Sequence, residues 1–164
     1  MARQDEFTRP VIVLLGAIVV LLAVGALAAY SLWPQDAGGY ANADDPTQVA
    51  LGRRVYMEAC ASCHGENLEG QPDWRVRLEN GRLPAPPHDA TGHTWHHPDE
   101  LLFGMTKIGI AAVAGLEGYE TDMPAFEGVL PDAEIWAVLA YIKSTWPPAV
   151  SARQANMNQQ YQQN

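Results

Sequence analysis

The motif Cys-Ala-Ser-Cys-His at residues 60–64 constrains this 164-residue chain more than any other stretch, because it holds both of the chain's cysteines. Two cysteines separated by two residues occur in structural zinc sites, in redox-active disulfides and in attachment sites for a covalent haem. Each kind of site requires further groups or a particular local fold. The rest of the sequence therefore decides among the three.

A structural zinc site needs four ligands, whereas Cys60, Cys63 and His64 supply three, and the adjacent Cys63 and His64 fit poorly into one tetrahedron. A thioredoxin-like site would follow a strand in a βαβ unit, but a helical pattern precedes this motif. For a covalent haem, the two thiols form thioethers and His64 reaches the iron from one side. The sequence favours haem.

The pattern along residues 46–146 is helical and contains no sustained strand alternation, which predicts an all-α domain. Asp45 is a candidate N-cap, and Pro46 follows at the first helical position of a segment that ends at the cysteine motif. Residues 98–109 form a second short helical pattern. Apolar residues spaced i, i+3, i+4 and i+7 predict a final helix over residues 131–146.

Residues 147–164 follow this helix and are rich in Gln and Asn. Such a composition favours disorder, so we expect a polar tail that is disordered or acts as a docking arm.

Residues 11–29 contain no polar side chain. As a helix, residues 11–33 would extend about 34 Å, enough to cross a bilayer core of about 30 Å. Because arginines precede this run and aspartates follow it, the positive-inside rule places the N-terminus in the cytoplasm. Residues 1–33 are thus predicted to be a single transmembrane anchor and residues 34–45 a linker. The alternative is a signal peptide cleaved after Ala28; either way the domain is exported.

An electron-transfer haem requires a sixth iron ligand from a distant part of the chain. Met57 lies on the attachment helix and cannot reach the opposite haem face, Met105 lies in a predicted helix, and Met157 lies in the polar tail. Met123 occupies a proline-bearing loop before the final helix and is the preferred ligand opposite His64. The other candidates are the histidines at positions 88, 93, 96 and 97.

The segments CASCHG (60–65), DMPAF (122–126) and EIWAVLAYIKSTWP (134–147) together resemble a class I cytochrome c of the membrane-anchored bacterial kind. The resemblance covers residues 46–146. It implies a small helical domain around one covalent haem c, in which the N-terminal and C-terminal helices cross at nearly right angles. The residues expected at this crossing are Gly52 and Tyr56 on the first helix and Ala140 and Tyr141 on the last.

The resemblance also implies that a proline carbonyl accepts a hydrogen bond from the non-ligating nitrogen of His64. Pro86 is the preferred residue, with Pro84 and Pro87 as alternatives.

Residues 88–97 hold four histidines and Trp95. By resemblance, Trp95 and one histidine contact the haem propionates, and Arg75, Arg77 and Lys107 are further candidates for this role. The second interpretation is a solvated polar loop, and the third is a metal site formed by His93, His96 and His97.

If His64 and Met123 both bind iron, no position is open for a substrate, which indicates electron transfer rather than catalysis. The net charge is −9, so the chain lacks the excess of basic residues that is expected of a nucleic-acid-binding protein. We expect a bacterial inner-membrane protein with a periplasmic haem domain and lipid around its anchor. Its expected donor is a quinol:cytochrome c oxidoreductase, and its expected acceptor is a terminal oxidase or a photosynthetic reaction centre.

Two alternatives stay open at the level of sequence. The chain could be a fixed haem c subunit of one larger membrane oxidoreductase, with residues 147–164 as a docking arm. It could also be a haem enzyme or gas sensor, which requires that Met123 does not bind iron.

Overall fold

The computed structural model describes residues 15–16, 18–22, 24–25 and 39–163. The chain divides into two compact units, Met1–Asp36 and Ala37–Asn164. In the first unit the described residues are helical, and their large aliphatic side chains are exposed. No helix among the described residues is long and apolar enough to cross a bilayer. Most of the predicted anchor lies outside the described residues.

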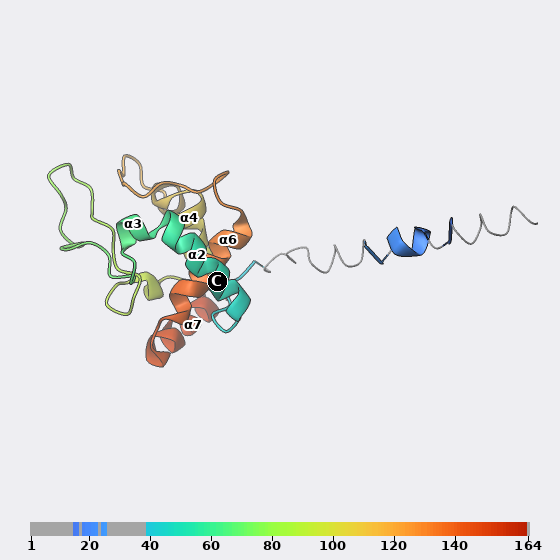
Figure 1. Cartoon of the computed structure of the whole chain (residues 1–164). Helices are drawn as coiled ribbons and strands as arrows, with labels where there is room; N and C mark the ends of the chain where they lie inside the picture. The colour runs from blue at the N-terminus through green and yellow to red at the C-terminus, as the bar shows by residue number, and fades with distance from the viewer. Residues whose placement is uncertain (1–14, 17, 23, 26–38, 164) are drawn as a thin grey trace, which may run out of the picture. The chain divides into compact units, whose positions relative to one another are not determined.

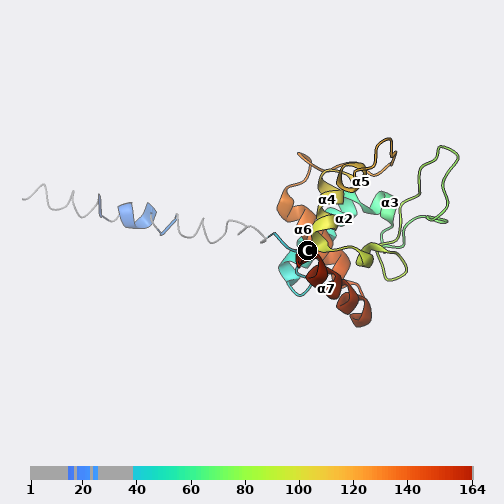
Figure 2. The same cartoon turned by 180° about the vertical axis from the view of Figure 1, so that it is seen from behind.

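The described part of the second unit contains helices and loops but no strand, as predicted for an all-α domain (Figure 1). Figure 2 shows from the opposite side that a long loop between α3 and η1 extends away from the helices. The elements are α2 (Pro46–Ala59), α3 (Ala61–His64), the 3₁₀ helix η1 (Thr94–His96), α4 (Asp99–Lys107), α5 (Ile110–Ala114), α6 (Asp132–Ser144) and α7 (Pro148–Gln162).

Helix α2 begins as the sequence predicts. The Asp45 carboxylate accepts a hydrogen bond from the backbone N–H of Thr47 (2.8 Å) and another from that of Gln48, and Pro46 takes the first helical position. These bonds satisfy backbone donors that have no partner within the first turn of a helix.

Helices α2 and α6 cross in close contact at Gly52. A Cβ atom on Gly52 would lie 1.8 Å from the carbonyl oxygen of Ala137 and 3.0 Å from Cβ of Tyr141. One turn along α2, the fully buried Tyr56 packs against Tyr141 with ring centroids 5.4 Å apart. Only glycine permits this approach, so the crossing fixes the position of the helix that leads to the cysteine motif.

The small residue that meets Gly52 is therefore Ala137 rather than the expected Ala140. Ala140 is also fully buried, but it belongs to a second cluster with Ala41, Leu102 and Trp136. Ala137 and Tyr141 are four residues apart and share one helix face.

The expected disorder of residues 147–164 is wrong for the described part of the tail, because residues 148–162 form helix α7. Gln154 is 2% exposed, and its amide donates to Oδ1 of Asp99 (2.6 Å) and to the carbonyl oxygen of His97 (3.3 Å). The N–H of Asp99 in turn donates to Oδ1 of Asn158 (2.8 Å). The tail thus folds by pairing polar groups at the start of α4, which composition does not reveal.

Asp99 joins the same region to α6. Its second carboxylate oxygen lies 2.5 Å from Nζ of Lys143, and Lys143 also donates to the carbonyl oxygen of Ala41 (3.2 Å). Both charged side chains are largely buried, so the hydrogen bonds from Gln154 and to Ala41 help to offset the cost of removing the charges from water.

We predict that Gly52→Ala lowers the free energy of unfolding by about 1–3 kcal/mol, because the added methyl group forces α2 and α6 apart. Urea unfolding followed by circular dichroism measures this change.

The matched control is Gly104→Ala, which also lies within a helix. Its Cβ would lie 3.1 Å from the side chain of Val113, on the short helix α5, which can shift. We expect a change within about 1 kcal/mol. Equal effects of the two substitutions would contradict the close crossing at Gly52.

Candidate haem site

The cysteine motif lies at the junction of α2 and α3. Cys60 ends α2, and its carbonyl oxygen accepts hydrogen bonds from the N–H groups of Cys63 (3.1 Å) and His64 (3.0 Å). This tight turn places the two thiols and the imidazole within one short helical segment.

Both cysteines are free; Cys60 is half-buried and Cys63 is exposed. Burial, and then the proximity of Cys63, raises the pKa of Cys60 to about 11, so this thiol is protonated at neutral pH. The chain thus presents two reduced thiols, the chemical form from which thioethers are made.

His64 is buried and hydrogen-bonded through Nδ1 to the carbonyl oxygen of Pro86 (2.9 Å). Because a carbonyl oxygen only accepts, Nδ1 carries the proton and Nε2 of the neutral ring is left unprotonated. Burial lowers the pKa of His64, although the bond to Pro86 partly opposes this effect. The imidazole is therefore in the form that binds a metal ion.

The loop after the motif brings Pro86 to His64. The N–H of Gly70 donates to the carbonyl oxygen of His64 (2.7 Å), and a Cβ on Gly70 would lie 2.4 Å from the nitrogen of Pro87. Gly70 also has a φ of +68°. The proline-rich segment can pack this closely only because the residue at position 70 is glycine. Pro87 is one of the two alternatives to Pro86, but its carbonyl oxygen has a different partner, the hydroxyl of Thr94 at 3.5 Å.

The ring of His88 packs against the face of the His64 ring. The two rings stack with centroids 4.0 Å apart and planes at 23°. Nδ1 of His88 is hydrogen-bonded to the hydroxyl of Thr94 (2.7 Å), and Trp146 donates to the carbonyl oxygen of His88 (2.8 Å). Burial, followed by the nearby His64 and His93, holds the pKa of His88 well below its usual value. The sequence marked His88 only as a candidate ligand, and nothing in it indicated this stacking.

Met123 is half-buried in the loop between α5 and α6. Its N–H donates to Oγ1 of Thr121 (3.1 Å). Beyond it, the N–H of the buried Phe126 donates to the carbonyl oxygen of Thr106 (3.0 Å), which holds the loop against α4. The thioether is thus carried by a loop that is fixed on its C-terminal side.

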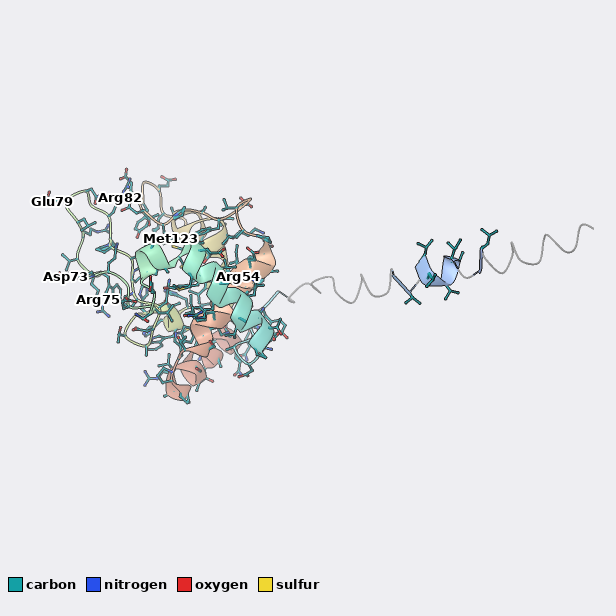
Figure 3. All side chains as sticks on the ribbon, in the orientation of Figure 1. Arg54, Asp73, Arg75, Glu79, Arg82 and Met123 are labelled. Atoms are coloured by element: carbon teal, nitrogen blue, oxygen red, sulfur yellow. The ribbon has the colours of Figure 1, made fainter. Side chains whose placement is uncertain are left out.

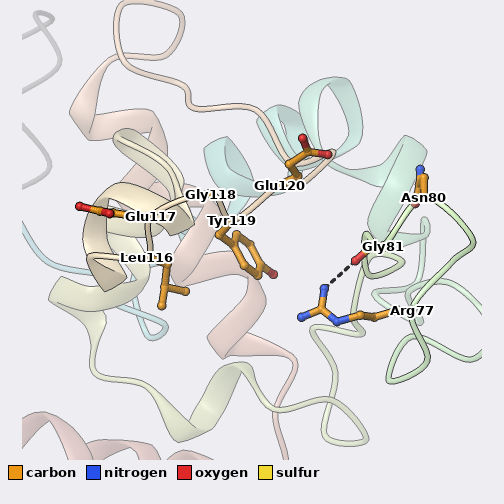
Figure 4. Close-up of a pocket in the computed structure, with 8 residues that line it drawn as sticks. All are labelled: Arg77, Asn80, Gly81, Leu116, Glu117, Gly118, Tyr119 and Glu120. Atoms are coloured by element: carbon orange, nitrogen blue, oxygen red, sulfur yellow. Dashed lines mark hydrogen bonds between the residues drawn. The ribbon is translucent and has the colours of Figure 1, made fainter.

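The loops that carry Pro86 and Met123 face each other across an open cleft of about 410 Å³ (Figure 4). The side chain of Arg77 points into this cleft and donates to the carbonyl oxygen of Gly81 (2.6 Å). The lining residues are Arg77, Asn80, Gly81, Leu116, Glu117, Gly118, Tyr119 and Glu120.

Two ring nitrogens in the histidine-rich segment are buried without a hydrogen-bond partner among the described residues: Nε1 of Trp95 and Nδ1 of His93. Trp95 stacks on His96 with centroids 3.6 Å apart, and His93 stacks on Trp74 with centroids 5.2 Å apart. A buried unpaired donor costs about 1–3 kcal/mol, so an acceptor supplied by a bound group would stabilise this arrangement.

Among the described residues, no three His, Cys, Asp or Glu side chains are grouped so that they could hold a metal ion, so the third interpretation, a metal site at His93, His96 and His97, gains no support. The residues that are present do fit a covalent haem. They supply two free thiols, an imidazole with an unprotonated Nε2 and an unpaired indole donor at Trp95.

The sequence model of the cytochrome c family matches residues 49–146. A curated relative, the thiosulfate dehydrogenase of Stutzerimonas stutzeri (strain A1501), is 31% identical over 141 residues, and the match covers 74% of this chain and 39% of the relative. This chain thus spans well under half of that enzyme's length. No solved structure gives a significant match. The family match covers more than half of the chain and includes the CASCH motif, so the chain belongs to the cytochrome c family and its two cysteines are the attachment sites of a covalent haem c.

Proposed function

We propose that this chain is a membrane-tethered carrier of single electrons whose haem iron is bound by His64 and Met123. The observation that carries the proposal is the state of His64. Its Nδ1 is committed to Pro86, which leaves Nε2 free beside two reduced thiols. Haem c supplies a reversible one-electron couple when it is bound.

The side chains determine how that couple behaves. The hydrogen bond to Pro86 orients His64 and makes Nε2 a stronger donor. A thioether from Met123 would raise the reduction potential relative to a second histidine. With both axial positions filled by protein, a substrate has no place to bind at the iron.

The tether is supported by the apolar run at residues 11–29 and by the exposed aliphatic side chains of the described helical residues 15–16, 18–22 and 24–25. Of the predicted linker at residues 34–45, Ala41 is buried in the core of the haem domain and accepts a hydrogen bond from Lys143. Residues 40–45 are therefore part of the haem domain, and the tether that precedes them would be shorter than the predicted 12 residues. The haem domain would therefore meet partners whose docking faces lie close to the periplasmic side of the inner membrane. A quinol:cytochrome c oxidoreductase as donor and a terminal oxidase or reaction centre as acceptor meet this condition.

The alternative of a fixed subunit relied on residues 147–164 as a free docking arm. Helix α7 is instead folded against its own domain through Gln154. This favours a mobile carrier over a fixed subunit.

A second candidate function is thiosulfate oxidation, because the relative described above is a thiosulfate dehydrogenase. We favour the carrier, because the matched region corresponds to a minor part of that enzyme and because His64 and Met123 would fill both axial positions.

We predict that thiosulfate alone does not sustain electron flow through the purified protein. Sodium thiosulfate with ferricyanide as acceptor should give no turnover above that of a protein-free control, whereas ascorbate should reduce the haem at once. Repeated turnover with thiosulfate would make the chain an enzyme and overturn the proposal.

We predict that Met123→Ala keeps the haem attached but opens the sixth position. The oxidised protein should lose the weak red absorption band that accompanies Met ligation, and the reduced protein should bind carbon monoxide. The control Met105→Leu, on α4, should leave both properties unchanged. An unchanged spectrum in Met123→Ala would show that another residue, such as a histidine, is the sixth ligand.

We predict that the protein is found in the membrane fraction and that it retains residues 1–33. Haem staining with intact mass measurement should give one membrane-bound species that retains its N-terminal segment. Replacing residues 1–33 with a cleavable signal peptide should release the haem domain into the soluble periplasmic fraction. A soluble native species that lacks residues 1–28 would contradict the anchor.

A further inference from the structure

Arg82 joins the two loops that carry Pro86 and Met123. Its guanidinium forms an ion pair with Asp122, the residue directly before Met123, and a second with Glu120 at 3.5 Å. Figure 3 shows Arg82 and Met123 on these two loops. The ion pairs therefore join segments that are 38–40 positions apart in the sequence.

The backbone around Arg82 is held in a defined turn. The N–H of Leu78 donates to the carbonyl oxygen of Arg82 (2.9 Å), and the N–H of Arg82 donates to Oδ1 of Asn80 (3.0 Å). Gly81, between them, has a φ of +81°, which favours glycine. The side chain of Arg82 is 35% exposed, against 56% for Asp122 and 69% for Glu120. The arginine is thus the more fixed member of the group.

The charges around Met123 require such a cation. Residues 108–142 contain no Lys or Arg but hold six acidic residues: Glu117, Glu120, Asp122, Glu127, Asp132 and Glu134. Among the described residues, Asp132 pairs with Lys107, while Asp122 and Glu120 pair with Arg82. Without Arg82, the carboxylates of Glu120 and Asp122, which both precede Met123, would repel each other with no cation between them.

We propose that Arg82 is a positioning residue that holds the Met123 loop in place and thereby keeps the sixth iron position closed to outside ligands. A continuous series of contacts then connects the two sides of the site. His64 is hydrogen-bonded to Pro86, the backbone runs from Pro86 over four residues to Arg82, and Arg82 forms an ion pair with Asp122 beside Met123. The inference rests on the proposed ligation by Met123.

The test uses the full-length, haem-loaded protein and neutral imidazole as the competing ligand. Because this ligand is uncharged, a change in the charge of the protein does not itself attract or repel it. Arg82→Gln should raise the affinity of the oxidised protein for imidazole about 3- to 10-fold, as expected for the loss of a partly exposed ion-pair network. Arg82→Lys should recover part of this difference. The red absorption band of unliganded Arg82→Gln should persist.

Salt provides a second readout, because it screens exposed ion pairs. High sodium chloride should bring the imidazole affinity of the wild-type protein toward that of Arg82→Gln, and it should change the variant little. The matched control is Arg54→Gln, whose side chain is exposed on α2. This substitution also removes one positive charge, and it should leave the imidazole affinity unchanged.

Equal imidazole affinities for wild type and Arg82→Gln would overturn the proposal, as would equal shifts for Arg82→Gln and Arg54→Gln. If Arg82→Gln does not fold, Asp122→Asn removes the same contact from the other side and must raise the affinity. Failure of Met123 ligation is distinguishable, because the wild-type protein itself would then lack the red band.

Discussion

The close crossing of α2 and α6 at Gly52 is the contact on which the rest of the structure depends. It brings Ala137 and Tyr141 against α2, and Tyr56 then packs against Tyr141 and donates its hydroxyl to the carbonyl oxygen of Gly65 (2.8 Å). The backbone is thereby held on both sides of the CASCH motif. The thiols and His64 are carried by a rigid frame, which suits a site that changes charge without changing shape.

The environment of His64 follows from contacts on three sides. The loop after the motif brings Pro86 to its Nδ1, the ring of His88 stacks on its face, and burial keeps it neutral. One ring atom, Nε2, is left free to bind. The other half of the proposed iron site depends on the longer loop that carries Met123. Hydrogen bonds to α4 hold this loop after Met123, and ion pairs to Arg82 hold it before Met123.

The local signals in the sequence were sufficient for much of the fold. Asp45 and Pro46 marked the start of α2, and apolar spacing predicted residues 131–146 for a helix observed at Asp132–Ser144. The family resemblance also placed Gly52 at the crossing and Pro86 at His64, and both contacts are present. Such features are readable because each depends on residues close in sequence or on a motif of fixed spacing.

The features that the sequence did not reveal depend on partners far apart in the chain. Helix α7 is polar, and its order comes from Gln154 reaching Asp99. The backbone that Gly52 meets belongs to Ala137, a residue that the sequence did not single out. The short helix α5 lies between the two helical patterns at residues 98–109 and 131–146, where the sequence predicted no helix. The pairing of Arg82 with Asp122 joins two loops with no periodic pattern.

The central claim is that His64 and Met123 bind the haem iron from opposite sides. Iron X-ray absorption spectroscopy of the oxidised, full-length protein tests it most directly, because it identifies the scattering atoms around the metal. The account predicts one sulfur and five nitrogens in the first coordination shell. A first shell of six nitrogen or oxygen atoms without sulfur would place a histidine or water at the sixth position and would contradict the account.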